Sequence, residues 1–259
     1  MKALTFKARF LTAQFKDHMS KMTRRTYLIP PPSVVAGMFG AILGIERKKL
    51  FDFSKELMAG AELRSFGGHI ITLARIFKID RATPQLLNLL KSYYSEDRSK
   101  IKEIQELLPI KESEELYMPE YKFAIASTNE SLIDEGIRRL RDLDMNYDLF
   151  GGNDYHFIEF IGDPKLAEVE KGKEGCGYCV REDLERVETE SFDVAFNASV
   201  IESTKFPIIM PVTFLANVNK EFVQVYGAKI VAKRELNVVN DGESRIFVYE
   251  VTPFLVMRI

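Results

Sequence analysis

The segment from residue 27 to residue 44, Tyr-Leu-Ile-Pro-Pro-Pro-Ser-Val-Val-Ala-Gly-Met-Phe-Gly-Ala-Ile-Leu-Gly, constrains the fold more than any other part of the chain. Three prolines predict an extended entry, and Ser33 then stands where a helix N-cap belongs. Gly37, Gly40 and Gly44 follow at spacings of three and four, so one face of the predicted helix lacks side chains. Because a glycine inside a helix costs about 1 kcal/mol relative to alanine, we expect that face to admit a close neighbour, either a sheet or a nucleic-acid backbone.

The charge is distributed unevenly along the chain. The 36 basic and 38 acidic residues give a net charge of −2, which argues against sequence-independent coating of nucleic acid. The first 30 residues nevertheless carry one acid, Asp17, and seven bases: Lys2, Lys7, Arg9, Lys16, Lys21, Arg24 and Arg25. The net charge of this segment is therefore +6, which leaves −8 for the rest of the chain. Because the basic segment precedes a helix N-terminus, the sequence predicts a local polyanion site. A solvated basic edge strand is the alternative.

Composition and cysteine content exclude several classes of protein. The longest apolar run, residues 34–45, is about twelve residues, whereas a membrane span needs about 20. We therefore expect no membrane association and a cytoplasmic protein without a signal peptide. Cys176 and Cys179 form a single CxxC, half of a zinc ribbon at best, and the three histidines show no ligand spacing. The sequence predicts neither a metal nor a cofactor.

Hydrophobic periodicity predicts an α+β fold with a ferredoxin-like βαββαβ order. The expected strands are residues 2–15, 68–79, 121–126 and 155–161, and the expected helices are residues 33–45 and a segment capped by Asn129 or Ser131 that ends at residue 143. An insert with helical patterns occupies about residues 80–120. A C-terminal β-rich part follows, with strands at 206–214, 222–233 and 246–255 and a turn at 240–243. We expect a domain at 1–165 and a β-rich part at 166–259 packed on it.

The Pro-Pro-Ser…Gly…Gly element after a basic first strand, together with the later Leu-Phe-Gly-Gly-Asn at 149–153, resembles a family of CRISPR-associated proteins. It is Cas family five of the RAMP superfamily, and the motifs cover residues 1–45 and 147–161. The resemblance implies an RRM-related ferredoxin-like fold in a type I Cascade interference complex of antiviral defence. There the family caps the 5′ end of the guide crRNA, contacts the repeat-derived handle, and packs against the first backbone subunit and the large subunit.

The predicted RNA-binding residues follow from what a single-stranded handle requires: cations for phosphates, bare backbone for close approach, and groups for splayed bases. Each assignment keeps its alternative. Tyr27 is a stacking platform or a core residue, the helix glycines admit RNA or a packed element, and the turn at 151–153 is an anion nest or an ordinary connection. The predicted residues are Lys21, Arg24, Arg25, Tyr27, Ser33, Gly37, Gly40, Gly151, Gly152 and Asn153.

Catalysis is not expected. One branch of the family, in type I-C systems, cleaves repeat RNA without metal through a tyrosine before the first helix and a Lys-His pair before the glycine turn. Here that turn reads Pro-Pro-Pro-Ser at 30–33, and no histidine lies between Tyr121 and Phe150. Metal-free cleavage needs one group that activates a 2′-OH and a second that protonates the leaving oxygen, and the sequence shows neither at these positions. A metal-independent endoribonuclease is the alternative, and an assembly protein whose basic edge meets an acidic partner is a third hypothesis.

Overall fold

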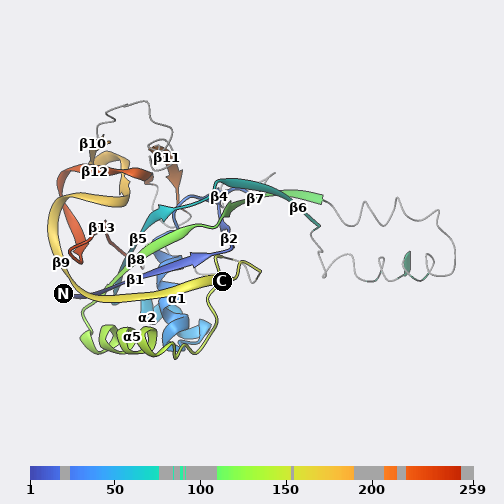
Figure 1. Ribbon diagram of the computed structural model, residues 1–259, viewed down its shortest axis with the longest axis horizontal. Coiled ribbons are helices and arrows are strands. Elements are labelled where there is room, and N and C mark those ends of the chain that lie inside the picture. The colour runs from blue at the N-terminus through green and yellow to red at the C-terminus, as the bar shows by residue number, and fades with distance from the viewer. Residues whose placement is uncertain are drawn as a thin grey trace, which may run out of the picture.

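The computed structural model describes residues 1–17, 24–75, 110–152, 155–189, 207–214 and 220–251, with a few single residues between 84 and 91. These residues form a nine-stranded sheet, a three-stranded sheet and a two-stranded ribbon (Figure 1). The helices are α1 (Pro32–Leu43), η1 (Arg47–Lys49), α2 (Leu50–Ser54), α5 (Glu130–Asp142) and η3 (Arg181–Asp183). The strands are β1 (Lys2–Phe10), β2 (Thr12–Ala13), β3 (Phe15–Lys16), β4 (Thr26–Tyr27), β5 (Leu57–Ser65), β6 (His69–Arg75), β7 (Ile110–Tyr117), β8 (Glu120–Ser127), β9 (Ile158–Val180), β10 (Leu184–Glu188), β11 (Ile208–Thr213), β12 (Glu221–Asn240), β13 (Arg245–Phe247) and β14 (Tyr249–Glu250).

Four adjacent antiparallel strands, in the order β9-β1-β8-β5, organise the large sheet. α1 precedes β5 and α5 precedes β9, and both helices lie on one face of the sheet (Figure 1). The predicted apolar side of the first strand faces them, because Leu4, Phe6, Ala8 and Phe10 are all fully buried in the same core as the inner residues of α1 and α5. The predicted apolar face of β1 is therefore confirmed, but the strand is not half-exposed throughout, because Ala3 and Thr5 on the opposite face are buried as well.

Two helix boundaries show how backbone chemistry sets the ends. α1 begins at Pro32 with Pro31 as its N-cap, so the prediction of Ser33 as the N-cap is wrong. Proline suits the first helical position, since its fixed φ fits the helix and the N–H it lacks would have no partner there. α5 begins after Asn129, one of the two predicted caps, and its buried residues include the predicted apolar positions Ile133 and Ile137.

Among the four strands β9, β1, β8 and β5, the one that follows β1 in the chain is β5, which the sequence did not predict. Its burial pattern is nearly continuous from Leu57 to Leu63, so the period-two signal of a half-exposed strand is absent. The predicted strand at 68–79 corresponds to β6, which pairs with β7 to form an arm that projects from the body (Figure 1). Apart from a few single residues, the helical patterns predicted at 84–108 lie outside the described residues.

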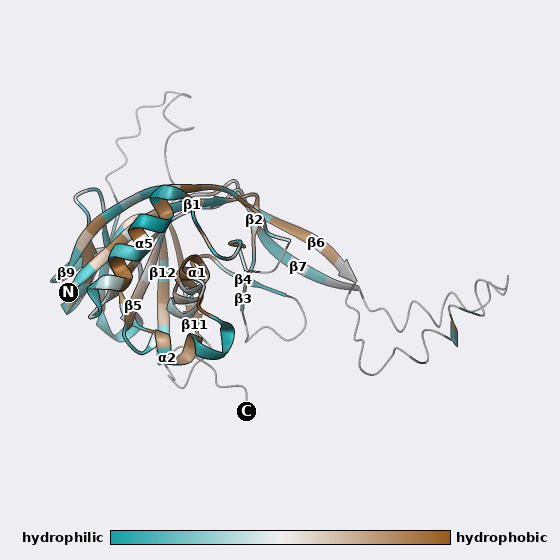
Figure 2. Ribbon diagram, turned by 90° about the horizontal axis from the view of Figure 1, so that it is seen from below, coloured by the Kyte–Doolittle hydropathy of each residue, from teal (hydrophilic) through white to brown (hydrophobic). Residues whose placement is uncertain are grey.

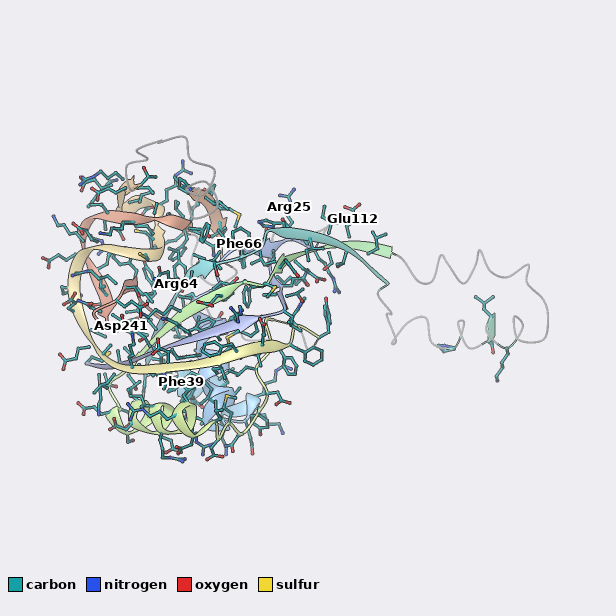
Figure 3. The ribbon with its side chains drawn as sticks, viewed as in Figure 1. Arg25, Phe39, Arg64, Phe66, Glu112 and Asp241 are labelled. Carbon is teal, nitrogen blue, oxygen red and sulfur yellow. The ribbon has the colours of Figure 1, made fainter. Side chains whose placement is uncertain are left out.

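The C-terminal strands β12 and β13 belong to the same sheet, and their side chains pack on the face opposite the helices. β9 continues through residue 165 to Val180 and pairs along much of its length with β12. The predicted turn between β12 and β13 is confirmed, and it places Asp241 and Glu243 on the sheet. Lys122 Nζ lies 2.6 Å from Asp241 Oδ2, and Glu243 contacts Lys7, Lys122 and Lys165 at 2.9–3.1 Å (Asp241 is labelled in Figure 3). The cations on this face are thus neutralised within the chain.

Candidate nucleic-acid interface

The cations of the first strand are engaged in ion pairs. Lys2 Nζ lies 2.5 Å from Asp134 Oδ1, Lys7 Nζ lies 3.0 Å from Asp163 Oδ2, and Arg9 Nε lies 2.8 Å from Glu159 Oε2. Their partners come from α5 and β9, which are distant in sequence. The local charge of +6 therefore overstates the positive potential of β1, because much of it is compensated in the folded chain.

The remaining described cations of the N-terminal segment gather on the ribbon of β3 and β4, which we call the basic ribbon: Lys16, Arg24 and Arg25. β3 and β4 pair through Phe15 with Tyr27 and Lys16 with Thr26. Lys16 and Arg25 are exposed and Arg24 is half-buried, and none of the three forms an ion pair with a described residue. The predicted Lys21 lies in the segment that joins the two strands, outside the described residues. Exposed cations without acidic partners are the groups that a phosphate backbone requires.

The glycine turn packs against the base of this ribbon. Gln14, which directly precedes β3, donates its backbone N–H to the Gly151 carbonyl at 2.7 Å. Its side-chain amide donates to Ser113 Oγ at 2.5 Å and reaches the Arg24 carbonyl at 3.4 Å. The structure therefore brings together Arg24 and Gly151, which are distant in the sequence, through one buried glutamine.

Close backbone approach explains both glycines of the turn. A Cβ on Gly151 would lie 2.8 Å from the Thr12 carbonyl oxygen, and Gly152 has a φ of 115° with the Gln14 carbonyl in the way of a side chain. The Gly151 N–H donates to the His156 carbonyl at 2.8 Å, so this amide is not free to bind an anion. Asn153 lies outside the described residues.

Tyr27 belongs to the core, which corrects its prediction as a stacking platform. Its side chain is 3% exposed, its ring packs edge-on against Phe214 at 5.2 Å, and its hydroxyl donates to the Thr213 carbonyl at 2.7 Å. The next two backbone amides, of Leu28 and Ile29, both donate to the side chain of a buried glutamine of β12, Gln224. The entry to α1 is therefore held rigidly by the C-terminal strands.

The three glycines of α1 have three different environments. A Cβ on Gly40 would lie 2.9 Å from Leu50 Cδ1, so this glycine permits α2 to pack on α1. Gly44 ends the helix in the left-handed region with φ 77°. A Cβ on Gly37 would meet no described atom within 4 Å, and Gly37 and Ser33, one turn apart, are both half-buried. Of the three, only Gly37 leaves space for an additional ligand.

Two exposed aromatic side chains follow the glycine turn and were not among the predicted site residues. Tyr155 is 49% exposed and Phe157 is 57% exposed, and the Phe157 ring lies 5.9 Å from that of Phe150. The sequence placed both in a strand, and a strand pattern does not show which aromatic side chains remain uncovered. Lys16 was counted in the local charge but was missed as a site residue, since its lack of an acidic partner is a property of the fold.

Each described histidine contacts a neighbouring side chain, and burial affects the pKa of His156 and of both cysteines. His69 Nδ1 lies 2.9 Å from Glu114 Oε1 on the arm, and His156 is buried with Nδ1 at 2.6 Å from Thr12 Oγ1. Burial lowers the pKa of His156. Burial also raises the pKa of Cys176 to about 12 and that of Cys179 to about 11. Among the described residues, no group of three or more histidine, cysteine or acidic side chains is arranged to hold a metal ion, and His18 lies outside them.

Fold and site together define a mixed α+β protein with an uncompensated basic ribbon beside a glycine turn. The chain belongs to the family described as CRISPR-associated protein (Cas_Cas5), whose model matches residues 3–184. This match confirms the family resemblance seen in the sequence. No helix of the described residues is long and apolar enough to cross a membrane.

Solved structures similar to this chain include other CRISPR proteins. A CRISPR protein from Archaeoglobus fulgidus is 9% identical over 96% of this chain and 100% of that chain, with a TM-score of 0.48. A chain of a CRISPR RNA-guided surveillance complex is 12% identical over 90% of this chain and 91% of that chain, with a TM-score of 0.43. The crystal structure of a Cas protein is 13% identical with a TM-score of 0.37; the match covers 60% of this chain and 58% of that chain. No curated protein matches the chain.

Proposed function

We propose that this protein is a non-catalytic subunit of a type I CRISPR Cascade interference complex that binds the 5′ repeat-derived handle of the guide crRNA. Membership of the Cas_Cas5 family supports the CRISPR assignment. The observation that carries RNA binding is the basic ribbon, whose Lys16, Arg24 and Arg25 have no acidic partner among the described residues, whereas the cations of β1 do. The crRNA, a backbone subunit and the large subunit are the proposed partners, and the complex acts in the cytoplasm.

The proposed fold is the ferredoxin-like, RRM-related arrangement of the RAMP superfamily. Its support is the element order β1-α1-β5-β8-α5-β9 and the antiparallel strand order β9-β1-β8-β5. In this arrangement β6 and β7 form an insertion between the second and third strands.

The handle would contact three features of the described chain. Phosphates would bind the basic ribbon, with Lys21 in the segment between its strands. The open position at Gly37 and the half-buried Ser33 would let the RNA approach the first turns of α1. Tyr155 and Phe157 replace Tyr27 as the aromatic groups on which bases could stack, because their side chains are exposed.

The non-catalytic assignment is supported by the positions of the two described histidines. His156 is buried against Thr12, and His69 pairs with Glu114, whose other carboxylate oxygen accepts a hydrogen bond from the Thr26 amide of the ribbon at 3.4 Å. Both imidazoles are thus engaged, although His69 lies close to the ribbon, which makes it the histidine to test first. Metal-independent cleavage of repeat RNA remains the alternative activity, and one assay separates the two functions.

The assay is incubation of the purified full-length chain with end-labelled cognate repeat RNA in EDTA, followed by both native and denaturing gels. The proposal predicts a mobility shift with intact RNA. Cleavage at a defined position would replace it with the endoribonuclease, and His69→Ala and His156→Gln would then be the next variants. Absence of a shift with the isolated chain and of guide RNA in the purified complex would contradict RNA binding.

A further inference from the structure

The face of the large sheet opposite the helices carries a cluster of cations. α1 and α5 cover one face of the strands (Figure 2), so side chains that point away from these helices reach the other face. Each of the strands β9, β1, β8 and β5 contributes one cation to the cluster, and we call the four the sheet cations: Lys165, Lys7, Lys122 and Arg64 (Arg64 is labelled in Figure 3). Lys7 and Lys122 are directly opposite each other in the register. Like charges at opposite positions repel, so this arrangement favours an anion beside the two lysines.

The carboxylate of Glu243 is that anion. Its Oε1 lies 3.1 Å from Lys7 Nζ and 3.5 Å from Arg64 Nη2. Its Oε2 lies 3.0 Å from Lys122 Nζ and 2.9 Å from Lys165 Nζ. The hydrogen bonds from Lys165, Lys122 and Lys7 hold the pKa of the Glu243 carboxyl well below its usual range. Oxygens of a phosphate group would bind the same cations in the same way, so Glu243 occupies an anion site.

The turn that presents Glu243 is fixed by its neighbour Asp241. Asp241 Oδ1 accepts hydrogen bonds from the amides of Glu243 at 3.1 Å and of Ser244 at 3.0 Å, and Gly242 between them has a φ of 82°. Asp241 Oδ2 lies 2.6 Å from the buried Lys122 Nζ. The Glu243 side chain is 32% exposed, and none of these bonds uses it. Glu243 therefore supplies charge to the sheet cations, whereas Asp241 sets the shape of the turn.

The sheet cations are accessible and are neutralised within the chain. The side chains of Lys7, Arg64 and Lys165 are 22%, 29% and 37% exposed. Among the described residues, the carboxylates paired with the sheet cations are those of Glu62, Asp163, Asp241 and Glu243. Four positive and four negative charges leave the cluster neutral. Without Glu243, one positive charge would be uncompensated, and an RNA phosphate could reach it.

We propose that Glu243 determines where this protein binds RNA: its carboxylate occupies the anion site of the sheet cations and excludes RNA phosphates from that face. The inference rests on the proposed function, in which the guide RNA binds the basic ribbon. Because Glu243 is tethered beside the sheet cations, it competes at a high effective concentration with any phosphate in solution. Such a residue discriminates against wrong binding without any contact to the right ligand. RNA is thereby confined to the basic ribbon.

The test is fluorescence anisotropy of the purified full-length chain with a short oligouridine as non-cognate RNA, over a range of salt concentrations. Glu243→Gln keeps the shape of the side chain and removes its charge. The proposal predicts that this variant neutralises one more phosphate, so the slope of log K against log salt steepens by about 0.7 unit and binding at about 0.1 M salt strengthens about fivefold. Addition of Lys7→Met should abolish the gain, because it removes a sheet cation. A carboxylate that only stabilised the fold would change the urea midpoint and leave oligouridine binding as in wild type.

Glu170→Gln is the matched control. Among the described ion pairs Glu170 contacts only Arg245, at 2.9 Å, and it accepts a hydrogen bond from the Asn240 side chain at 3.3 Å, beside the same turn. This variant makes the same change of charge and should bind oligouridine as wild type does.

Four results would overturn the inference: wild-type oligouridine binding by Glu243→Gln, a gain that persists after Lys7→Met, an equal gain in Glu170→Gln, or loss of the folded state in Glu243→Gln, which would assign the carboxylate to stability alone. Cognate repeat RNA is measured in parallel. A wild-type chain that does not bind it, with the gain of Glu243→Gln intact, would refute the proposed function and leave the shielding by Glu243.

Discussion

Replacement of Lys122 by methionine should destabilise the protein strongly, because it removes the cation from a buried ion pair. The Lys122 side chain is 1% exposed and that of Asp241 is fully buried, with 2.6 Å between Nζ and Oδ2. Asp241 also accepts hydrogen bonds from the Thr5 hydroxyl at 2.7 Å and from the Ser244 amide at 3.0 Å. Without the ammonium group, a carboxylate would stay in the interior beneath the turn.

Two considerations set the magnitude. Burial alone would raise the pKa of Asp241. The hydrogen bonds from Lys122, Thr5 and the turn amides outweigh this effect and lower the pKa from 3.8 to about 2. At about 1.4 kcal/mol per pKa unit, this difference corresponds to about 2 kcal/mol of stability. Loss of one partner of a buried ion pair costs about 3–5 kcal/mol in general, because the other charge remains desolvated. We therefore expect Lys122→Met to cost between about 2 and 5 kcal/mol.

The assay is urea denaturation of Lys122→Met, Asp241→Asn and the double variant, with the midpoint compared at constant slope. The double variant should be more stable than the sum of the single effects predicts, since the second change removes the uncompensated charge. The pH dependence has a definite sign. A lowered carboxylate pKa stabilises the fold above pH 3.8, and this contribution is lost as the pH falls toward about 2.

Lys165→Met is the matched control. Lys165 is 37% exposed and lies 2.9 Å from Glu243 Oε2, so its loss should cost at most about 1 kcal/mol. A cost of Lys122→Met no larger than that of the control, or additive effects in the double variant, would refute the role of the buried pair.

Three further predictions follow from glycine geometry, histidine burial and thiol burial. Gly37→Ala should stabilise the protein by up to about 1 kcal/mol and weaken RNA binding, whereas Gly152→Ala should destabilise the protein by more than about 1 kcal/mol. Denaturant midpoints measure the stability of both variants, and gel shifts measure their RNA binding. Reduced stability of Gly37→Ala would contradict the open space at this position. Burial lowers the pKa of His156, so the unfolded chain takes up a proton near pH 6.5 that the folded chain does not. The free energy of unfolding should therefore fall between pH 7.5 and pH 5.5, and His156→Gln should reduce this fall. Cys176 and Cys179 should react slowly with a thiol reagent at pH 7.5, because burial raises the pKa of each, and rapid labelling of the native protein would disprove their burial.

Local patterns predicted the elements whose signals are local. The apolar face of β1, the helix α5 that begins after Asn129 and the turn before β13 are each encoded within about a dozen residues, and the structure confirms them. β5 was missed because burial on both faces removes its alternation, and Ser33 was misplaced as a cap because the preceding prolines already begin the helix.

The candidate site was only partly predictable because its charges are settled by partners distant in sequence. Arg24 and Arg25 were predicted, but the neutralisation of Lys2 by Asp134 depends on how α5 packs beside β1. The sequence left stacking and core packing open for Tyr27, because its position beside the proline turn does not reveal that Phe214, about 190 residues later, covers its ring. Burial and pairing of this kind arise from tertiary contacts, which no single segment encodes.

The central claim is that the basic ribbon holds the guide RNA, and the salt dependence of RNA binding by the assembled complex tests it most directly. Lys16, Arg24 and Arg25 are changed together to alanine. Arg47, Lys48 and Lys49 of η1, which are exposed and likewise form no ion pair with described residues, serve as a control of equal charge. The account predicts that the ribbon variant binds more weakly and loses about one to three units of the slope of log K against log salt, while the η1 variant matches wild type. An unchanged slope in the ribbon variant, or a loss confined to the η1 variant, would contradict it.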